Sequence, residues 1–516
     1  HVRSRRQRQM CIRDRLNTTI DVADGFGLRT AATISATNSG TINVSGSGAG
    51  IAFQAADGSQ IATSLDLSDS QGLTIRATGA GGRGVVANTT GVVNTAVNVS
   101  IQHTAGGSAL VLGDGVTTVV NGGVLRSNSR TAPTVATNKV THFTNSATGE
   151  VNAPNGGGTA LSFDDQSTTL VNVGRIAGLV DLGAGNNVLQ NTGTIDGEVR
   201  AGTGDNTLSL DGGTITGNVR LAGATGANSL LLKDGSRIGT FLGSSGDDTV
   251  TVQGAGNQFT ALDGGAGNDT LVFDGATYAL TDSNVIRSFD QVRLRNAATL
   301  TLQTTLAGKP ASGAAIDLDG ENTTLVIKPT IVGDVTLGNA LLGTGLVQVD
   351  AGSHAFNLAS SVGSAFRGTL AVDRGTFTLG GNNASALSNA TLRMGAGNIT
   401  SVADGVQSIG GLAFDGGTLI FNAQAPGQIT APGSINAGTL DASGTGAVRV
   451  TVPTSLVATP PGTPNVLNLL SQDDANAGIK LVSAGTTIGS GGALALQDQN
   501  GNAITAARDL CLLYTS

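Results

Sequence analysis

The stretch Gly183-Ala-Gly-Asn-Asn-Val-Leu189 is the first copy of a signature that repeats between Asp181 and Ala276. The second copy, Gly202-Thr-Gly-Asp-Asn-Thr-Leu208, keeps the two glycines, the polar pair and the final leucine. Three more copies follow, the first two of them one residue longer: Gly223–Leu230, Gly243–Val250 and Gly265–Leu271. The final apolar residues are 19, 22, 20 and 21 positions apart, so the segment repeats about every 20 residues.

Apolar and polar residues alternate between the signatures. In Thr207-Leu-Ser-Leu210 the two leucines share one side of the chain, and Thr214–Leu221 alternates in the same way. Such alternation is typical of half-buried strands. Equivalent residues of successive repeats are expected to stack: Ile195 on Ile215, Val199 on Val219, Ala201 on Leu221 and Arg200 on Arg220. Because a unit this short cannot bury its own apolar side, the pattern predicts an all-β parallel β-solenoid with about 20 residues per coil.

Both ends of the sequence carry residues that we exclude from the fold. Arg5–Arg15 matches a translated sequencing adapter, and Cys511–Ser516 matches one frame of the reverse complement of that adapter. Residues 1–15 and 510–516 are therefore expected to be artefacts. Six of the 28 basic and one of the 36 acidic residues lie in 1–15, which leaves 22 and 35 and changes the net charge from −8 to −13. The reading frame is therefore expected to be cut at both ends, which leaves room for a signal peptide or a membrane domain outside it.

The composition favours a repetitive β-structure over disorder and argues against several kinds of site. Glycine accounts for 78 of 516 residues, yet 39% of the residues are apolar and alternate regularly. Both cysteines lie in the excluded ends, so no disulfide framework, thiol nucleophile or Cys-based zinc site is expected. The sequence contains no run of 18 apolar residues, so it predicts no membrane-spanning helix. The acidic balance, without a basic and aromatic patch, disfavours nucleic acid as a partner.

Less regular coils are expected on both sides of the signatures. Four of the ten prolines fall between Pro453 and Pro464 and predict a break in the solenoid. The sequence thus divides into four parts: irregular coils in 16–180, regular coils in 181–276, coils with a second pattern rich in glycine and threonine in 277–455, and a junction of short β-segments in 456–509.

The second pattern is shared with a known family. It runs through Phe366–Asn382, Ala390–Leu392, Gln407–Leu412 and Gly416–Phe421. In this order the segments resemble the passenger-associated repeat of Gram-negative autotransporters (type V secretion), and the Asn/Asp-rich coils resemble the passengers of the same family. The resemblance implies a right-handed β-helix, a location at the cell surface, in the outer membrane or outside the cell, and a C-terminal outer-membrane β-barrel as the partner. The junction in 456–509 is similar to the segment that precedes the barrel in pertactin-like members.

A polar column stands two residues before the end of each signature, formed by Asn187, Asn206, Asn228, Asp248 and Asp269. We expect a ladder in which these side chains hydrogen-bond to the backbone of neighbouring coils. A second interpretation is calcium binding, because Gly264–Leu271 fits the nonapeptide of RTX repeats. Carboxylates stacked about 4.8 Å apart repel each other, and a cation between Asp248 and Asp269 would relieve that repulsion. In that interpretation Asp247 or Asp263 would supply a further ligand. The ladder is the preferred interpretation, so no metal or cofactor ligand is assigned.

Catalytic groups are scarce. His103, His142 and His354 lie in strand-like stretches without a paired Ser or Asp motif, and all three are expected on the coil surface. Neither Gly-x-Ser-x-Gly nor Gly-Asp-Ser-Gly occurs, which leaves a serine hydrolase unsupported. No residue is therefore assigned to catalysis.

Three functions follow as hypotheses. The resemblance implies a non-catalytic adhesin or structural stalk, whose host or bacterial surface ligand the sequence does not identify. A β-helical polysaccharide lyase or hydrolase is the alternative, and acidic and basic residues that meet in a groove would favour it. Arg200 and Arg220 are expected to stack near Glu198, in the preferred interpretation as a solvated ion ladder. A calcium-stabilised RTX-like exoprotein is the third hypothesis, and chelation would unfold such a protein.

Overall fold

The structure, a computed structural model, describes residues 19–31, 39–68, 70, 72–96, 98–137, 139–154, 157–221, 225–309, 313–330, 333–422, 433–451, 481–497 and 500–503. The chain forms two compact units, residues 1–270 (unit 1) and 271–516 (unit 2). Both are built from parallel strands wound into a β-solenoid, as the sequence predicts. The expected artefacts at both ends, the proline-rich break and most of the expected junction lie outside the described residues.

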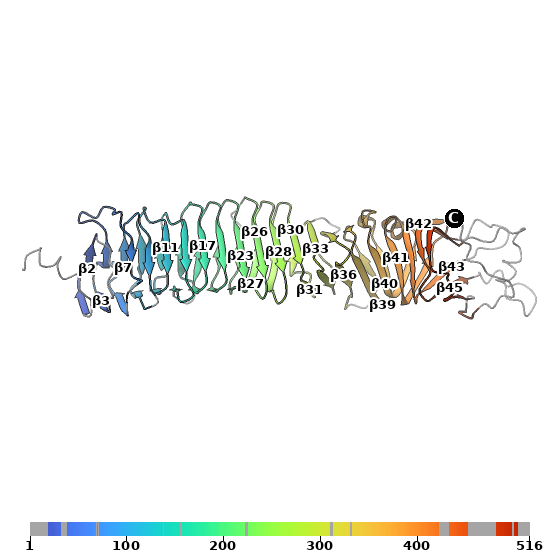
Figure 1. The fold of residues 1–516 in the computed structure, drawn as a ribbon, viewed down its shortest axis with the longest axis horizontal. Helices are drawn as coiled ribbons and strands as arrows, with labels where there is room; N and C mark the ends of the chain where they lie inside the picture. The colour runs from blue at the N-terminus through green and yellow to red at the C-terminus, as the bar shows by residue number, and fades with distance from the viewer. Residues whose placement is uncertain are drawn as a thin grey trace, which may run out of the picture. The chain divides into compact units, whose positions relative to one another are not determined.

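A full coil of unit 1 places one strand on each of three faces. Figure 1 shows the strands of successive coils following one another along the unit. Face 1 consists of β1 (Thr19–Val22), β3 (Gly40–Val44), β6 (Leu73–Ala77), β9 (Ser100–His103), β12 (Val124–Ser127), β15 (Glu150–Asn152), β18 (Arg175–Ala177), β21 (Thr194–Asp196) and β24 (Thr214–Ile215). Face 2 consists of β2 (Gly25–Thr30), β4 (Gly48–Phe53), β7 (Gly82–Ala87), β10 (Leu110–Leu112), β13 (Val135–Ala136), β16 (Thr159–Ser162), β19 (Leu179–Asp181), β22 (Val199–Arg200) and β25 (Val219–Arg220). Face 3 consists of β5 (Leu65–Asp66), β8 (Val93–Thr95), β11 (Thr118–Asn121), β14 (His142–Asn145), β17 (Thr169–Asn172), β20 (Val188–Asn191), β23 (Thr207–Asp211), β26 (Ser229–Lys233) and β28 (Thr249–Gln253). The longer strands β27 (Arg237–Leu242) and β29 (Gln258–Asp263) run across faces 1 and 2.

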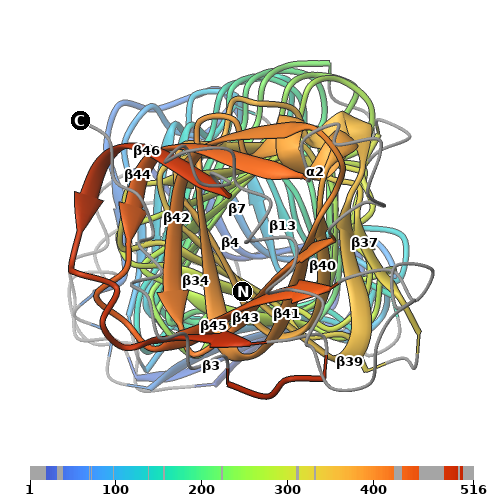
Figure 2. The same ribbon diagram turned by 90° about the vertical axis from the view of Figure 1, so that its right-hand side faces the viewer.

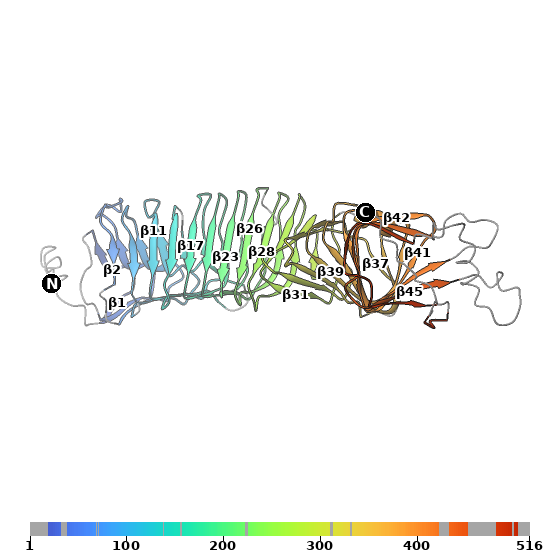
Figure 3. The ribbon, with the colours of Figure 1, turned by 45° about the vertical axis from the view of Figure 1, so that its right-hand side comes forward.

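The register between coils confirms the predicted stacking. Ile195 pairs with Ile215 and Arg200 with Arg220, and the strands of face 3 follow one another as a regular series (Figure 3). The predicted coil length of about 20 residues holds only for the regular part. Paired residues are 19 apart between β17 and β20 but 34 apart between β4 and β7, and the solenoid averages about 23 residues per turn. The difference arises because the earlier coils carry longer turns between their strands.

The core of unit 1 is a series of apolar columns, to which each strand contributes one or more residues per coil. On face 3 the column is at most 1% exposed to solvent and contains Leu170, Leu189, Leu208, Leu230 and Val250. Burial of one such side chain contributes roughly 1.5–3 kcal/mol. Because each coil places only a few side chains inside, the stability of a coil depends on its two neighbours.

Unit 2 begins with the same strand pattern and then changes to longer strands. Its shorter strands are β30 (Thr270–Asp274, which starts at the boundary), β31 (Thr277–Leu280), β32 (Ile286–Arg287), β33 (Gln291–Arg295), β34 (Thr299–Leu302), β35 (Ala315–Asp319), β36 (Thr324–Ile327), β37 (Val335–Leu337) and β38 (Leu341–Gly343). The later strands are β39 (Leu346–Leu358), β40 (Thr369–Leu379), β41 (Thr391–Val402), β42 (Val406–Asp415), β43 (Thr418–Asn422), β44 (Ser434–Asp441), β45 (Gly446–Thr451), β46 (Val482–Ile488) and β47 (Leu494–Gln497). The first half of β41 pairs with β42 and the second half with β43, so two series continue side by side, β42 with β44 and β43 with β45 (Figure 2).

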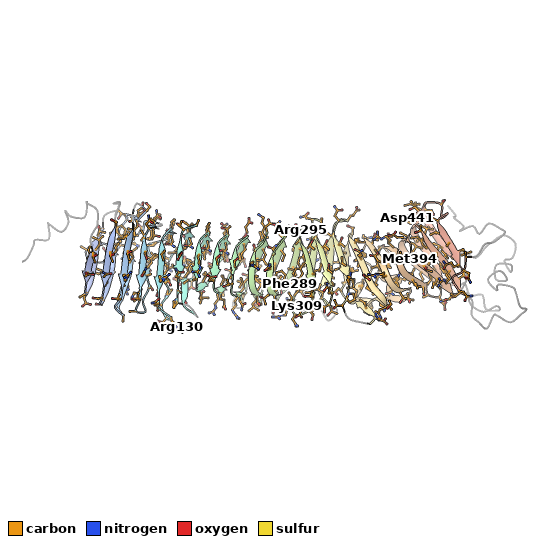
Figure 4. All side chains as sticks on the ribbon, turned by 90° about the horizontal axis from the view of Figure 1, so that it is seen from below. Arg130, Phe289, Arg295, Lys309, Met394 and Asp441 are labelled. Atoms are coloured by element: carbon orange, nitrogen blue, oxygen red, sulfur yellow. The ribbon has the colours of Figure 1, made fainter. Side chains whose placement is uncertain are left out.

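Helix is limited, within the described residues, to the 3-10 turn η2 (Ser360–Val362) and the short α2 (Gly381–Ala386), which lie in the turns after β39 and β40. In unit 2 as in unit 1, apolar side chains fill the inside and most charged side chains point outward, whereas Asp248, Asp269 and Asp274 are buried. Figure 4 shows Phe289, which is fully buried, among the strands and Arg295 and Lys309 at the margin. No helix of the described residues is both long and apolar enough to span a membrane.

Candidate functional site

The turn from face 2 to face 3 carries the polar column of the signature, and we call it the signature corner. Its five side chains are at most 2% exposed: Asn187, Asn206, Asn228, Asp248 and Asp269. Nδ2–H of Asn187 donates to Oδ1 of Asn206 at 3.0 Å, and Nδ2–H of Asn206 donates to Oδ1 of Asn228 at 2.9 Å. The backbone N–H of each asparagine donates to the same oxygen of the next coil. The predicted ladder is confirmed, with side-chain to side-chain bonds in addition to the expected bonds with backbone.

This ladder ends in two buried carboxylates. Asp248 accepts hydrogen bonds from the backbone N–H and the Nδ2–H of Asn228, and from the backbone N–H and the hydroxyl of Ser244. Asp269 accepts the backbone N–H of Asp248 at 2.7 Å. These donors surround the oxygens of Asp248 that the calcium hypothesis needs as ligands. Among the residues with described positions, no three or more His, Cys, Asp or Glu side chains gather closely enough to hold a metal ion.

A second buried ladder stands at the turn from face 3 to face 1, the asparagine corner. Its members are 1% exposed or less: Asn121, Asn145, Asn172 and Asn191. Nδ2–H of each of the first three donates to Oδ1 of the next coil at 2.7 to 2.8 Å, and Nδ2–H of Asn191 donates to the carbonyl oxygen of Thr214 at 3.2 Å. The sequence reasoning missed this ladder, because its members are 24, 27 and 19 residues apart. The signal that could have found it is an asparagine that ends a strand two residues before a glycine, as in Asn172-Val-Gly174 and Asn191-Thr-Gly193.

The turn from face 1 to face 2 contains a column of glycines, and we call it the glycine corner. Gly178, Gly197, Gly217 and Gly239 follow one another from coil to coil, and backbone hydrogen bonds join the last three. A Cβ atom on Gly197 would lie 2.2 Å from the carbonyl oxygen of Gly178, and one on Gly217 would lie 2.5 Å from that of Gly197. No side chain fits at these glycines, because a Cβ atom would clash with the neighbouring coil. The surface beside Gly178 and Gly197 is hollowed.

Charged side chains flank the hollow over two coils. Arg175 donates to Asp196 at 2.5 Å and to Oδ1 of Asn152 at 3.1 Å. Arg200 donates to Glu198 at 2.5 Å. Arg175, Asp196, Glu198 and Arg200 line a groove of about 420 Å³ whose floor includes Gly178 and Gly197; we call it the trench.

The trench contains some of the charged residues that the sequence analysis expects to stack, and two that it does not predict. The expected stack of Arg200 on Arg220 near Glu198 is confirmed, since Nε of Arg220 lies 3.5 Å from the same Glu198 carboxylate. The sequence reasoning missed Arg175 and Asp196, which enter the trench from face 1. Every charged group that flanks the floor is engaged in an ion pair, and the side chains of the two arginines are each half exposed. The arrangement therefore offers hydrogen-bond donors and acceptors to a ligand, whereas a pair of free carboxylates for acid and base catalysis is not formed.

The histidines occupy three different environments. His142 is exposed and His354 is partly exposed, but the expectation of a surface position is wrong for His103, which is fully buried. Nε2 of His103 bonds to the carbonyl oxygen of Gly82 at 2.7 Å, and Nδ1 accepts the backbone N–H of Gly107 at 2.9 Å. Burial lowers the pKa of His103 below its usual 6.5. Its role is to satisfy the backbone of the 105–107 turn, which the sequence around it does not reveal.

Comparison with known proteins gives partial matches. No protein-family model matches the chain. The chain is similar to the uncharacterized lipoprotein YdeK of Escherichia coli (strain K12), with 40% identity over 197 residues, 34% of this chain and 15% of YdeK. It is also similar to the uncharacterized protein YuaQ of the same strain, with 37% identity over 187 residues, 36% of this chain and 14% of YuaQ. The chain thus spans about one seventh of the length of these two relatives. The resemblance to autotransporters stays a prediction from the sequence.

Proposed function

We propose that the chain belongs to the exported, surface-exposed passenger region of a Gram-negative autotransporter, where it acts as a structural stalk or an adhesin without catalytic activity. The observation that carries this proposal is the pair of buried ladders at the signature and asparagine corners. Each ladder joins consecutive coils of unit 1 through side-chain amides in addition to the backbone bonds of the three faces. Such a stack resists bending and presents the same polar faces coil after coil, which suits a stalk.

Two further findings support the location. One relative carries the name of a lipoprotein and comes from a Gram-negative bacterium, which agrees with a place in the cell envelope. The chain uses no cysteine outside the ends that we exclude, which agrees with export, because a disulfide formed before translocation would obstruct threading. The proposed partner is an outer-membrane β-barrel encoded beyond Asp509.

The experiment is to recover the uncut gene and to read it past Asp509. We expect the sequence of an outer-membrane β-barrel, and the encoded protein, expressed in a Gram-negative host, should be cut by protease added to intact cells. A stop codon directly after this region, together with protection from external protease, would sink the proposal. The protease result separates a surface protein from one that remains inside the cell.

A polysaccharide lyase or hydrolase is the second candidate, and the trench is the observation that favours it. Acidic and basic side chains from adjacent coils meet in a groove, as that hypothesis requires. The test is to incubate the purified chain with polysaccharides and to measure new reducing ends and unsaturated uronate absorbance. Cleavage that disappears in Glu198→Gln would establish the enzyme and remove the purely structural role.

A further inference from the structure

The trench at the glycine corner has the shape of a binding site for an extended polymer. Part of its lining is bare backbone, because Gly178 and Gly197 carry no side chain and the neighbouring coil leaves no room for one. The groove is lined at Gly178 and Gly197, and the glycine column continues beyond it through Gly217 and Gly239, three coil steps in all, on the order of 14 Å at the strand spacing of a sheet. The lined part measures about 420 Å³, within the range of ligand sites in proteins.

The trench walls offer donors and acceptors side by side. Arg175 and Asp196 form one wall and Arg200 and Glu198 the other, and each arginine is paired with its carboxylate at 2.5 Å. A guanidinium has five N–H donors and a carboxylate has about four acceptor sites, so each pair keeps unused hydrogen-bonding capacity toward solvent. Vicinal hydroxyl groups donate and accept at once, and they match such a wall better than a purely anionic or cationic group does.

The charge balance narrows the ligand class further. The four charged side chains that line the trench carry two positive and two negative charges, and Arg220 of the next coil adds one positive charge 3.5 Å from Glu198. A local excess of a single positive charge gives little attraction for a charged polymer. The whole chain is acidic, with a net charge of −8, and repels polyanions at long range. Paired arginines are also poor ligands for an anion, because the anion would have to displace Asp196 or Glu198.

We infer that the trench binds an uncharged polysaccharide, laid along the glycine column with its hydroxyl groups on the two ion-paired walls. Binding of a polysaccharide would give the proposed adhesin its ligand. It rests on the proposed function only in that the chain has to be exposed at the cell surface to reach this ligand. Among the described residues that line the trench none is aromatic, so binding depends on hydrogen bonds and stays weak for a short oligosaccharide. Longer chains bind better, because they occupy more of the column.

The experiment measures retardation of the purified full chain in native gels that contain a polysaccharide. The probes are three neutral polymers (dextran, a soluble β-1,3-glucan and a galactomannan) and one polyanion, polygalacturonate. We expect at least one neutral polymer to retard the chain, and 1 M NaCl to change that retardation less than twofold, because the ligand has no charge. Retardation by polygalacturonate alone, or by none of the four, would overturn the inference.

Variants locate the binding. Arg175→Ala and Glu198→Ala each remove one member of an exposed ion pair and should weaken retardation at least fivefold. Arg237→Ala is the matched control, since Arg237 points outward from face 1 beside Gln258 and does not line the trench. Circular dichroism and thermal unfolding show whether each variant keeps the fold. Retardation that survives both trench variants would place the ligand elsewhere and end the inference.

The two proposals fail in different ways. A chain that binds a neutral polymer but is protected from protease in intact cells would retain the trench and lose the surface role. A surface-exposed chain that binds none of the polymers would retain the surface role and lose the trench as a binding site.

Discussion

Asparagine and aspartate have different consequences in a buried ladder. An asparagine accepts through Oδ1 and donates through Nδ2, so it can stand between two equal neighbours, whereas an ionised aspartate only accepts. In the signature corner three asparagines precede Asp248 and Asp269, and every amide donates toward the C-terminal side. The hydrogen bonds of the ladder therefore all run in one direction. A carboxylate is tolerated at its C-terminal end, because it accepts the N–H groups that the preceding coil donates.

A substitution in the middle of the asparagine corner tests how much one buried amide contributes to stability. Asn172→Ala should destabilise unit 1 by about 2 kcal/mol, because Oδ1 of Asn191 loses the amide that donates to it and a buried acceptor is left unpaired. Urea unfolding followed by circular dichroism measures the loss. The control is Asn186→Ala, an exposed side chain of the neighbouring turn that accepts one backbone N–H, and it should cost at most about 1 kcal/mol. Equal effects of the two changes would contradict a special role of burial.

His103 makes the N-terminal coils sensitive to acid. Its pKa is lowered in the folded chain, chiefly by burial, so at a pH below 6.5 the unfolded chain binds more protons than the folded one. The contribution of neutral His103 to the free energy of unfolding is fully present above pH 6.5, and it is lost as the pH falls through the pKa of the folded chain. Hydrogen exchange of residues 77–110 should be faster at pH 5 than at pH 7.5, after correction for the intrinsic rate. His103→Gln should reduce this difference and the exposed His142→Gln should not; if both behave alike, the protonation argument fails.

Calcium should have no effect on the stability of the signature corner. The oxygens of Asp248 already accept four hydrogen bonds from Asn228 and Ser244, and a cation would have to displace these donors. Thermal unfolding should shift by less than 1 °C between 5 mM calcium and excess chelator, roughly the shift that a few tenths of a kcal/mol would produce. A clear fall in the unfolding temperature on chelation would instead favour the RTX-like hypothesis.

At the scale of the elements, each corner of the coil has its own means of turning the chain. Two corners combine a ladder of buried amides with glycines, and the third has glycines without such a ladder. The glycines act by close approach, because the carbonyl oxygen of the coil before lies where a Cβ atom would be. Only part of the set is visible in the sequence: the signature corner repeats at nearly constant spacing, and its polar column could be predicted. The other two corners become apparent only when coils of different length are placed in register.

A pair of glycine substitutions separates close approach from backbone conformation. In Gly197→Ala the new Cβ would meet backbone atoms of Gly178 that cannot move aside, and we expect a loss of about 3 kcal/mol. Gly235 has a positive φ of 82° but open space around it, so Gly235→Ala should cost only about 1 kcal/mol. Denaturant unfolding of both variants gives the comparison. A larger loss at Gly235 would mean that conformation, rather than contact, governs these turns.

What the sequence could predict follows from how local each feature is. Alternation within a strand and repetition of one turn are local, and they were sufficient for the fold class and for the stacking of Arg200 on Arg220. The burial of His103 depends on the 105–107 turn and on Gly82 of the preceding coil. The trench depends on Arg175 and Asp196, which are 21 residues apart and meet because β18 and β21 are neighbours on face 1. Such contacts cannot be derived before the register is known.

At the scale of the whole molecule, each unit is a stack in which a coil contacts its neighbours along the stack. Damage in one coil should therefore remain local. In Asn172→Ala, hydrogen exchange should accelerate in residues 142–196, whereas residues 229–253 should keep the rates of the parent chain. Uniform acceleration across unit 1 would show that the unit unfolds as one body, and the nearest-neighbour description would then be wrong.

The alignment of equivalent groups also bears on how such a protein changes length over evolutionary time. A second copy of residues 188–206 inserted after Asn206 would place asparagine against asparagine at two corners and glycine against glycine at the third. Duplication of one 19-residue segment thus adds a coil, about 4.8 Å long, and requires no new kind of contact. A chain with this duplication should keep the β-sheet circular dichroism of its parent. Coils of 19 to 22 residues stay in register in this part because the turns take up the extra residues, whereas an insertion of half a coil would move each group out of line with its partner. Gain and loss of length should therefore proceed by whole coils.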